Sequence, residues 1–258
     1  MDIQLANRFF VVCGAGSGFG KAIALRLVSE GAHVLAIARG AESLRQLQSV
    51  VPDAIEALAG DLTDISFHEQ IVHALNGRVP DGLVVNAGGP PAKSFIETHI
   101  RDWDEAYKNL VRWKIALVKQ ILPGMQQRSY GRILFIESMS VKQPVENLVL
   151  SNSLRLAVVG MAKTLSLEVG SQGITVNVMA PGYHDTPAMG RLFAKKSEQK
   201  GISLKEARLV FEKELLTGHM GDPSEFAMLA AWLLSSTSGY INGQTFSVDG
   251  GLIRFVFG

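Results

Sequence analysis

The chain has 258 residues, with 25 basic and 24 acidic side chains, so nothing in its charge favours nucleic acid or an anionic membrane surface. A single cysteine, Cys13, excludes an internal disulfide and fits a reducing compartment. The six histidines stand at no metal-ligand spacing, and no apolar run approaches the roughly 18 residues of a membrane span. The first residues also lack the pattern of a signal peptide. We therefore expect a cytoplasmic protein without a metal site.

Short apolar runs alternate along the chain with segments of helical periodicity, which is typical of a parallel sheet covered by helices on both faces. The expected strands are residues 9–13, 33–38, 55–59, 82–86, 132–137, 175–179 and 245–248. The expected helices are residues 18–29, 42–50, 66–76, 102–127, 148–170 and 223–234. No repeat or linker interrupts them. The pattern predicts an α/β fold, a single doubly wound Rossmann domain over residues 1–258 with a seven-stranded parallel sheet.

The first expected strand leads into a glycine-rich turn, Cys13-Gly14-Ala15-Gly16-Ser17-Gly18-Phe19-Gly20, which opens the first helix. Glycines let a backbone turn tightly and approach a pyrophosphate, and a helix N-terminus offers free N–H groups and the positive end of a dipole. The Gly-x-x-x-Gly-x-Gly spacing differs from the commoner dinucleotide fingerprint. Alone, this loop indicates a phosphate site only weakly, because an ordinary strand-to-helix turn can look the same.

Residues 187–220 differ from the rest of the chain, being mostly polar and without an expected strand. Between residues 191 and 213, seven basic side chains stand against three acidic ones. An insertion at this point would cover the carboxyl ends of the strands, where open α/β sheets bind ligands. We expect a substrate lid here; a solvated helical face is an equally good interpretation.

Four further stretches follow the ends of the later strands: Val85-Asn86-Ala87-Gly88, Ser138, residues 181–186, and residues 243–251, which close in Val248-Asp249-Gly250-Gly251. Together with the glycine loop, they make the chain resemble the short-chain dehydrogenase/reductase family over essentially its whole length. Within that family, it resembles the bacterial β-ketoacyl-acyl-carrier-protein reductase branch.

The resemblance implies cofactor-binding roles at the glycine loop and at several strand ends. Asp61 has an alternative interpretation as a helix N-cap, and Cys13 stands where the family usually has threonine. The implied residues are Gly14, Ser17, Gly18, Phe19 and Gly20 near the pyrophosphate; Asp61 and Leu62 at the adenine; Asn86, Ala87 and Gly88 at the adenosine ribose; Pro181, Gly182 and Thr186 on the nicotinamide side; and Arg155 at ribose hydroxyls.

The choice of cofactor follows from charge at the end of the second expected strand. A site specific for NAD needs a carboxylate there to bind the ribose hydroxyls, whereas this strand ends at Arg39. An arginine can pair with a 2′-phosphate. We expect NADP(H) in preference to NAD(H), although an exposed arginine that merely opens a helix is the simpler interpretation.

The catalytic pattern of the family is broken in this chain. The resemblance implies that Ser138 positions a carbonyl, but at the family's catalytic Tyr and Lys positions, counted from Ser138, the chain has Ser151 and Arg155. A family Asn in the preceding helix falls on Leu110; Asn109 is adjacent, but one residue turns a side chain by about 100° around a helix. Arg155 can still hold ribose hydroxyls but cannot relay protons, and a serine is a far weaker acid than a phenol. Positioned proton transfer is typically worth about 10²–10⁴-fold in rate.

Three hypotheses follow from this broken pattern. The first is an NADP(H)-dependent oxidoreductase that reduces a carbonyl with an atypical site, in which Ser138, Ser151 and Arg155 act and Ser151 with a water, Tyr183, His184 or Lys142 supplies the proton. The second is a cofactor-binding pseudoenzyme or regulatory subunit without hydride transfer. The third is non-redox chemistry with the cofactor as scaffold.

The remaining features of the sequence bear on the substrate and on the assembly. The basic lid and its apolar residues Met189, Leu192, Phe193 and Phe211 favour an acyl thioester or another anionic carbonyl compound. The two long helices carry apolar residues on more than one stripe, and residues 252–257 are too apolar to remain in water. With the resemblance, these features predict a homotetramer.

Overall fold

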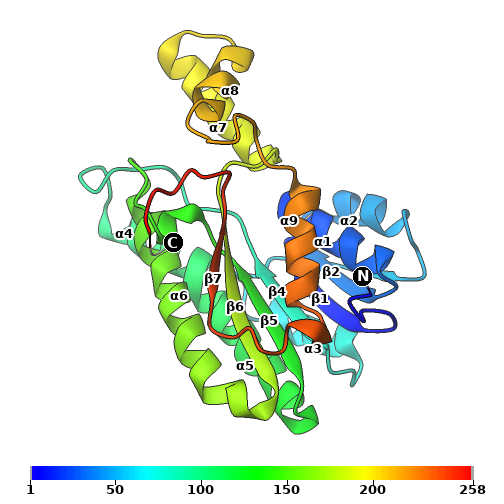
Figure 1. The fold of residues 1–258 in the computed structure, drawn as a ribbon. Helices are drawn as coiled ribbons and strands as arrows, with labels where there is room; N and C mark the ends of the chain where they lie inside the picture. The colour runs from blue at the N-terminus through cyan, green and yellow to red at the C-terminus, as the bar shows by residue number, and fades with distance from the viewer. Residues whose placement is uncertain (1, 257–258) are drawn as a thin grey trace.

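The computed structural model describes residues 2–256, in which seven strands form one parallel sheet in the order β3-β2-β1-β4-β5-β6-β7 (Figure 1). The strands are β1 (Phe9–Cys13), β2 (His33–Ala38), β3 (Ile55–Ala59), β4 (Gly82–Asn86), β5 (Gly131–Ile136), β6 (Ile174–Pro181) and β7 (Thr245–Val248). The predicted fold class is confirmed, with β5 one residue earlier and β6 longer than expected. Chain order reverses between β1 and β4, which opens a crevice at the carboxyl edge of the sheet.

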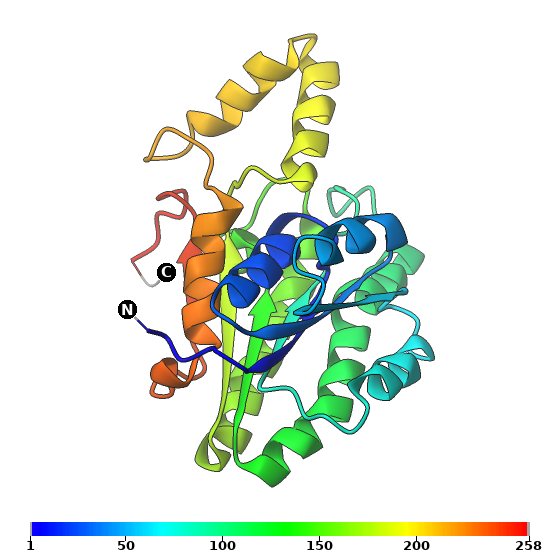
Figure 2. The ribbon, with the colours of Figure 1, turned by 90° about the vertical axis from the view of Figure 1, so that its right-hand side faces the viewer.

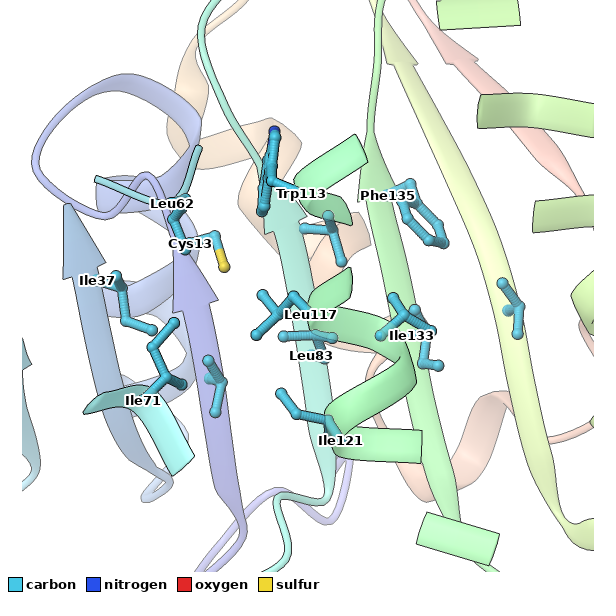
Figure 3. Close-up of a cluster of buried hydrophobic side chains, with 14 of the residues drawn as sticks. Cys13, Ile37, Leu62, Ile71, Leu83, Trp113, Leu117, Ile121, Ile133 and Phe135 are labelled. Carbon is cyan, nitrogen blue, oxygen red and sulfur yellow. The ribbon is translucent and has the colours of Figure 1, made fainter. Parts of the chain in front are cut away.

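Helices cover both faces of the sheet because successive strand side chains point to opposite sides. Phe9, Val11 and Cys13 of β1 belong to one buried cluster, and Phe10 and Val12 belong to the other. Figure 3 shows part of the first cluster. This first face is covered by α3 (Phe67–Leu75), α5 (Trp113–Arg128) and α6 (Val149–Val169). The second face is covered by α1 (Gly18–Ser29), α2 (Ala41–Gln48) and α9 (Pro223–Leu233).

The expected helix over residues 102–127 is helical throughout, but it is not one regular α-helix. It is divided into α4 (Ile100–Tyr107), a π-helical turn, η1 (Lys108–Arg112), and α5. A π turn holds one more residue than an α turn, so the side chains before it are rotated around the helix axis relative to those of a regular α-helix. The division keeps Leu110 and Val111 buried in the core. Counting residues along a regular helix therefore fails at this point.

Helices α7 (Pro187–Lys200) and α8 (Leu204–Glu212) project beyond the carboxyl edge of the sheet (Figures 1 and 2). Arg208 ties α8 to the chain before α7 through two hydrogen bonds to Asp185, of 2.9 and 2.7 Å. No helix within residues 2–256 is long and apolar enough to cross a membrane. That part of the chain also contains no cluster of three or more His, Cys, Asp or Glu side chains suited to a metal ion.

Candidate active site

A cavity of about 790 Å³ lies at the carboxyl edge of the sheet, where the chain order reverses. The strand order places the ends of β2 and β3, with Arg39 and Asp61, on one side of it, and the end of β5, with Ser138, on the other. Arg191 and Leu192 of α7 also line it. Its volume lies within the range of ligand-binding cavities, roughly 300–1,000 Å³.

Most of the sequence-predicted site residues meet in this cavity. Gly20 and Gly182 do not line it; their small size is required by packing. A Cβ atom at Gly20 would lie 2.2 Å from the carbonyl oxygen of Gly14, and one at Gly182 would lie 2.7 Å from Cβ of Asp249. The lining residues include Gly14, Ser17, Gly18, Phe19, Arg39, Asp61, Leu62, Asn86, Ala87, Gly88, Ser138, Ser151, Arg155, Pro181 and Thr186.

The glycine loop forms a cradle suited to a phosphate. Gly14 and Gly18 have φ angles of +67° and +53°, which favour glycine, and a Cβ atom at Gly14 would lie 2.6 Å from Nδ2 of Asn86. The N-cap residue of α1, Ser17, makes no side-chain hydrogen bond to the helix, and the first turn holds no acidic residue. The free N–H groups of α1 can therefore receive an anion. These residues fit the pyrophosphate of a dinucleotide.

At the β2–β3 side of the cavity, Arg39 and Asp61 differ in their contacts. Arg39 is exposed and makes no hydrogen bond or ion pair within residues 2–256. Asp61 accepts hydrogen bonds from the N–H and the hydroxyl of Thr63, at 3.0 and 2.9 Å. It therefore shapes the turn after β3 as well as lining the cavity, and the N-cap of α3 is Ser66 instead. Arg39 is the cation available to a ligand phosphate on this side.

On the β5 side, Arg155 is held by an acidic residue that sequence reasoning did not single out. Its Nη1 donates to both the backbone oxygen and Oε2 of Glu137, each at 3.1 Å. Its Nη2 lies 3.5 Å from the carbonyl oxygen of Gly88. The other carboxylate oxygen of Glu137 accepts a hydrogen bond from Nζ of Lys114. Three charged side chains are thus buried together beside the cavity.

Serine hydroxyls lie beside Arg155 in this cluster. Nε of Arg155 donates to Oγ of Ser151 at 3.1 Å, and Oγ of Ser140 lies 3.4 Å from the same oxygen. Ser138 begins the 3₁₀ turn η2 (Met139–Val141), and its Oγ accepts the N–H of Ser140 at 3.2 Å. Because Oγ of Ser151 accepts from Arg155, its own proton is available for another acceptor.

The π turn brings Asn109 into the cavity lining, next to Trp113. Leu110, which residue counting selected, is fully buried in the core. The indole nitrogen of Trp113 donates to the backbone oxygen of Asn109 at 3.0 Å and holds the irregular turn. Figure 3 places Trp113 near Cys13 and Leu62, beside the cavity end of the strands. Asn109 was missed because the sequence gives no sign of the extra residue in this turn.

The other side chains considered as proton donors point elsewhere. Tyr183 donates to Oε2 of Glu214 at 3.1 Å, and burial, with the nearby Glu214 carboxylate, raises its pKa above the usual range. His184 packs against Phe19 and Phe226, and burial lowers its pKa. Neither residue lines the cavity, nor does Lys142. The thiol of Cys13 is fully buried, which raises its pKa to about 12 and makes it a poor nucleophile.

Comparison with known proteins shows to which family this chain belongs. A family model described as Enoyl-(Acyl carrier protein) reductase matches residues 14–253. The chain belongs to the short-chain dehydrogenase/reductase family. It is 27% identical to the NADPH-dependent reductase BacG of Bacillus subtilis, over 98% of this chain and 100% of that protein. It is 28% identical to the 3-oxoacyl-[acyl-carrier-protein] reductase FabG of Vibrio cholerae, over 97% and 99%.

A solved structure shows the same fold over nearly the same length. The L-sorbose reductase of Gluconobacter frateurii, in complex with NADPH and L-sorbose, superposes with a TM-score of 0.92 at 27% identity. The match covers 99% of this chain and 100% of that one. The predicted family is therefore confirmed, and reductases of the FabG type are among its relatives.

Proposed function

We propose that this protein is an NADP(H)-dependent reductase whose acceptor is a carbonyl compound such as a 3-oxoacyl thioester. The observation that carries the proposal is the meeting of Ser138, Ser151 and Arg155 in the same cavity as the glycine loop. Bound NADPH supplies a hydride. Reductases that use NADPH or take 3-oxoacyl substrates are among the relatives of this chain.

In this proposal, Ser138 and Ser151 donate hydrogen bonds to the oxygen that becomes negative. Arg155 polarises the hydroxyl of Ser151 through the 3.1 Å contact from Nε and contributes positive charge. A cation and fixed donors stabilise a developing oxyanion. Because neither a serine hydroxyl nor a guanidinium is an effective acid near neutral pH, water in the cavity delivers the final proton.

The same arrangement favours a second acceptor, a carbon–carbon double bond conjugated to a carbonyl. Hydride addition to its far carbon moves an electron pair onto the oxygen, and the resulting enolate takes its proton from water at carbon. An enolate is a weaker base than an alkoxide, so it depends less on an acid in the site. The lining of the cavity offers no Tyr, His or Lys within residues 2–256, and the matching family model is described as an enoyl reductase.

We propose an anionic substrate because of the side chains that α7 contributes. Arg191 and Leu192 line the cavity, so the substrate would meet one cation and one apolar side chain there. Met189, Phe193 and Phe211 instead pack in the cluster that holds α7 and α8 together. In this proposal residues 187–220 act as the substrate lid.

The test is NADPH oxidation across matched pairs of acceptors, each a saturated ketone or 3-oxoacyl thioester and its conjugated counterpart. NADPH deuterated at the transferred position marks the carbon that is reduced. Label at the carbonyl carbon supports the first acceptor, and label at the far carbon supports the second. In either case Ser138→Ala should lower kcat by about 10²-fold, the order of one lost oxyanion donor.

The absence of turnover with any acceptor, when NADPH binding has been shown, would favour a cofactor-binding pseudoenzyme. The double variant Ser151→Tyr with Arg155→Lys then serves as the decisive comparison. Reductase activity in the double variant alone would show that the natural site is catalytically idle.

A further inference from the structure

Lys114 is the only lysine buried within residues 2–256. It lies at the second position of α5, directly after the π turn, with its Nζ on the carboxylate of Glu137. The Lys114 and Glu137 side chains are 1% and 0% exposed. Burying a charge costs several kcal/mol even when it is paired, and apolar replacements of buried ion pairs are often as stable or more so. A gain in stability is therefore a poor explanation for Lys114.

The charge of the cluster suggests what Lys114 does. Arg155 and Glu137, taken alone, form a pair without net charge, at 3.1 Å. Lys114 occupies the second oxygen of the same carboxylate, so the three side chains together carry one positive charge. Glu137 and Arg155 line the cavity, whereas Lys114 stands behind them. The β5 side of the cavity, formed by Glu137 and Arg155, therefore carries a net positive charge only because Lys114 is present.

We propose that Lys114 is a positioning residue that sets the charge of this wall, and so makes the site bind the reduced cofactor in preference to the oxidised one. The proposal rests on NADP(H) being the cofactor, as proposed above. The nicotinamide ring is positively charged in NADP⁺ and neutral in NADPH, and the rest of the two molecules is alike. The resemblance places Arg155 at ribose hydroxyls of the cofactor, so a positive charge in this wall would repel the ring of the oxidised form and not that of the reduced form.

The test compares dissociation constants of NADP⁺ and NADPH, measured by calorimetry and needing no substrate. Lys114→Gln keeps a donor for Glu137 but removes the charge, so the ratio Kd(NADP⁺)/Kd(NADPH) should fall by about tenfold, the effect of one charge about 10 Å away at an effective dielectric constant of about 20. Burial lowers the pKa of Lys114, and Glu137 opposes that shift. Binding is therefore compared at about pH 6.5 and about pH 7.5, because the lower pH favours the charged ammonium.

Two further variants separate charge from structure. Lys119→Gln makes the same change at an exposed position of α5 and should leave the ratio unaltered. The double variant Lys114→Met with Glu137→Gln removes one charge of each sign, so Arg155 alone gives the cluster its single positive charge. The ratio should then return to that of the natural protein. A structural role alone would not produce that recovery. The double variant also provides the charge comparison if Lys114→Gln does not fold.

The outcomes distinguish this inference from the proposed function. If the natural protein binds neither form of the cofactor, the proposed function fails. If it binds both, and the ratio in Lys114→Gln equals that in Lys119→Gln, only the role of Lys114 is overturned. A lowered ratio that the double variant does not restore would also contradict it.

Discussion

At the scale of single residues, the two arginines at opposite sides of the cavity are suited to different tasks. Arg155 is buried and fixed by Glu137, Ser151 and Gly88, so it can orient its neighbours but cannot follow a ligand. Arg39 is exposed, without a partner among residues 2–256, and free to close on an incoming group. A fixed cation suits a reacting centre, and a free one suits recognition of a phosphate.

Arg39→Gln tests that recognition. Charge-assisted hydrogen bonds contribute about 1.5–3 kcal/mol, so the Kd for NADPH should rise by roughly 10- to 150-fold, while that for NADH changes little. Arg45→Gln is the matched control, because Arg45 is an exposed arginine of α2 that pairs with Glu42 and does not line the cavity. Equal weakening of NADPH and NADH binding by Arg39→Gln would show that Arg39 does not choose the cofactor.

At the scale of elements, the strands were predictable because a buried parallel strand is a short apolar run between turn residues, as in residues 9–13 and 82–86. The long helix over residues 102–127 was predicted as continuous because its apolar spacing survives the π turn. The extra residue changes which side chain faces the cavity without changing the composition of the segment. Asn109 could therefore be placed only by the structure.

The candidate site was predictable where chemistry depends on a motif and hidden where it depends on packing. Ser138, Ser151 and Arg155 could be found by counting from strand ends. Lys114 and Glu137 follow no motif, and they meet only because α5 lies over the end of β5. In the sequence, the one sign that these two charged side chains are buried is the apolar residues beside them, as at Trp113-Lys114-Ile115 and Phe135-Ile136-Glu137. Such a signal does not reveal its partner.

His184 joins three elements, since its ring packs on Phe19 of α1 and Phe226 of α9, and its Nδ1 lies 3.2 Å from the carbonyl oxygen of Gly182 after β6. Burial lowers its pKa below 6.5, against the opposing effects of the Gly182 carbonyl and of Glu225, Asp222 and Asp249. The unfolded chain therefore takes up the proton first as the pH falls. The stability contributed by neutral His184 is present above about pH 6.5 and is lost below it.

The measurement is the melting temperature between about pH 7.5 and about pH 5.5. The natural protein should lose more stability over this interval than His184→Gln, which has no proton to gain at that position. His73→Gln, at an exposed histidine of α3, should keep the natural pH dependence. If the melting temperature changes with pH to the same extent in all three proteins, the protonation of His184 does not determine acid stability.

At the scale of the whole molecule, large apolar side chains are exposed at several places in the described chain, and two sets of them bear on assembly. One set lies on and beside the helices α4 and α6, where Ile96, Ile100 and Leu167 are 94%, 79% and 75% exposed. A second set includes Met228 of α9 and, near the C-terminus, Val256. Phe257, part of the apolar C-terminal run, lies outside the described residues. Exposed apolar sets of this kind mark interfaces, and two self-complementary interfaces are what a twofold-symmetric tetramer needs.

We propose the homotetramer on this ground, and Leu167→Glu tests it. Light scattering after size exclusion should give four times the mass of one chain for the natural protein. In the variant, a charge would be buried in the α6 interface, and the mass should fall to that of a dimer held by the second set. Val50→Glu places the same charge at an apolar side chain that is 60% exposed after α2 and should remain tetrameric. A monomeric mass for the natural protein would refute the assembly, and an unchanged mass for Leu167→Glu would exclude α6 from its interface.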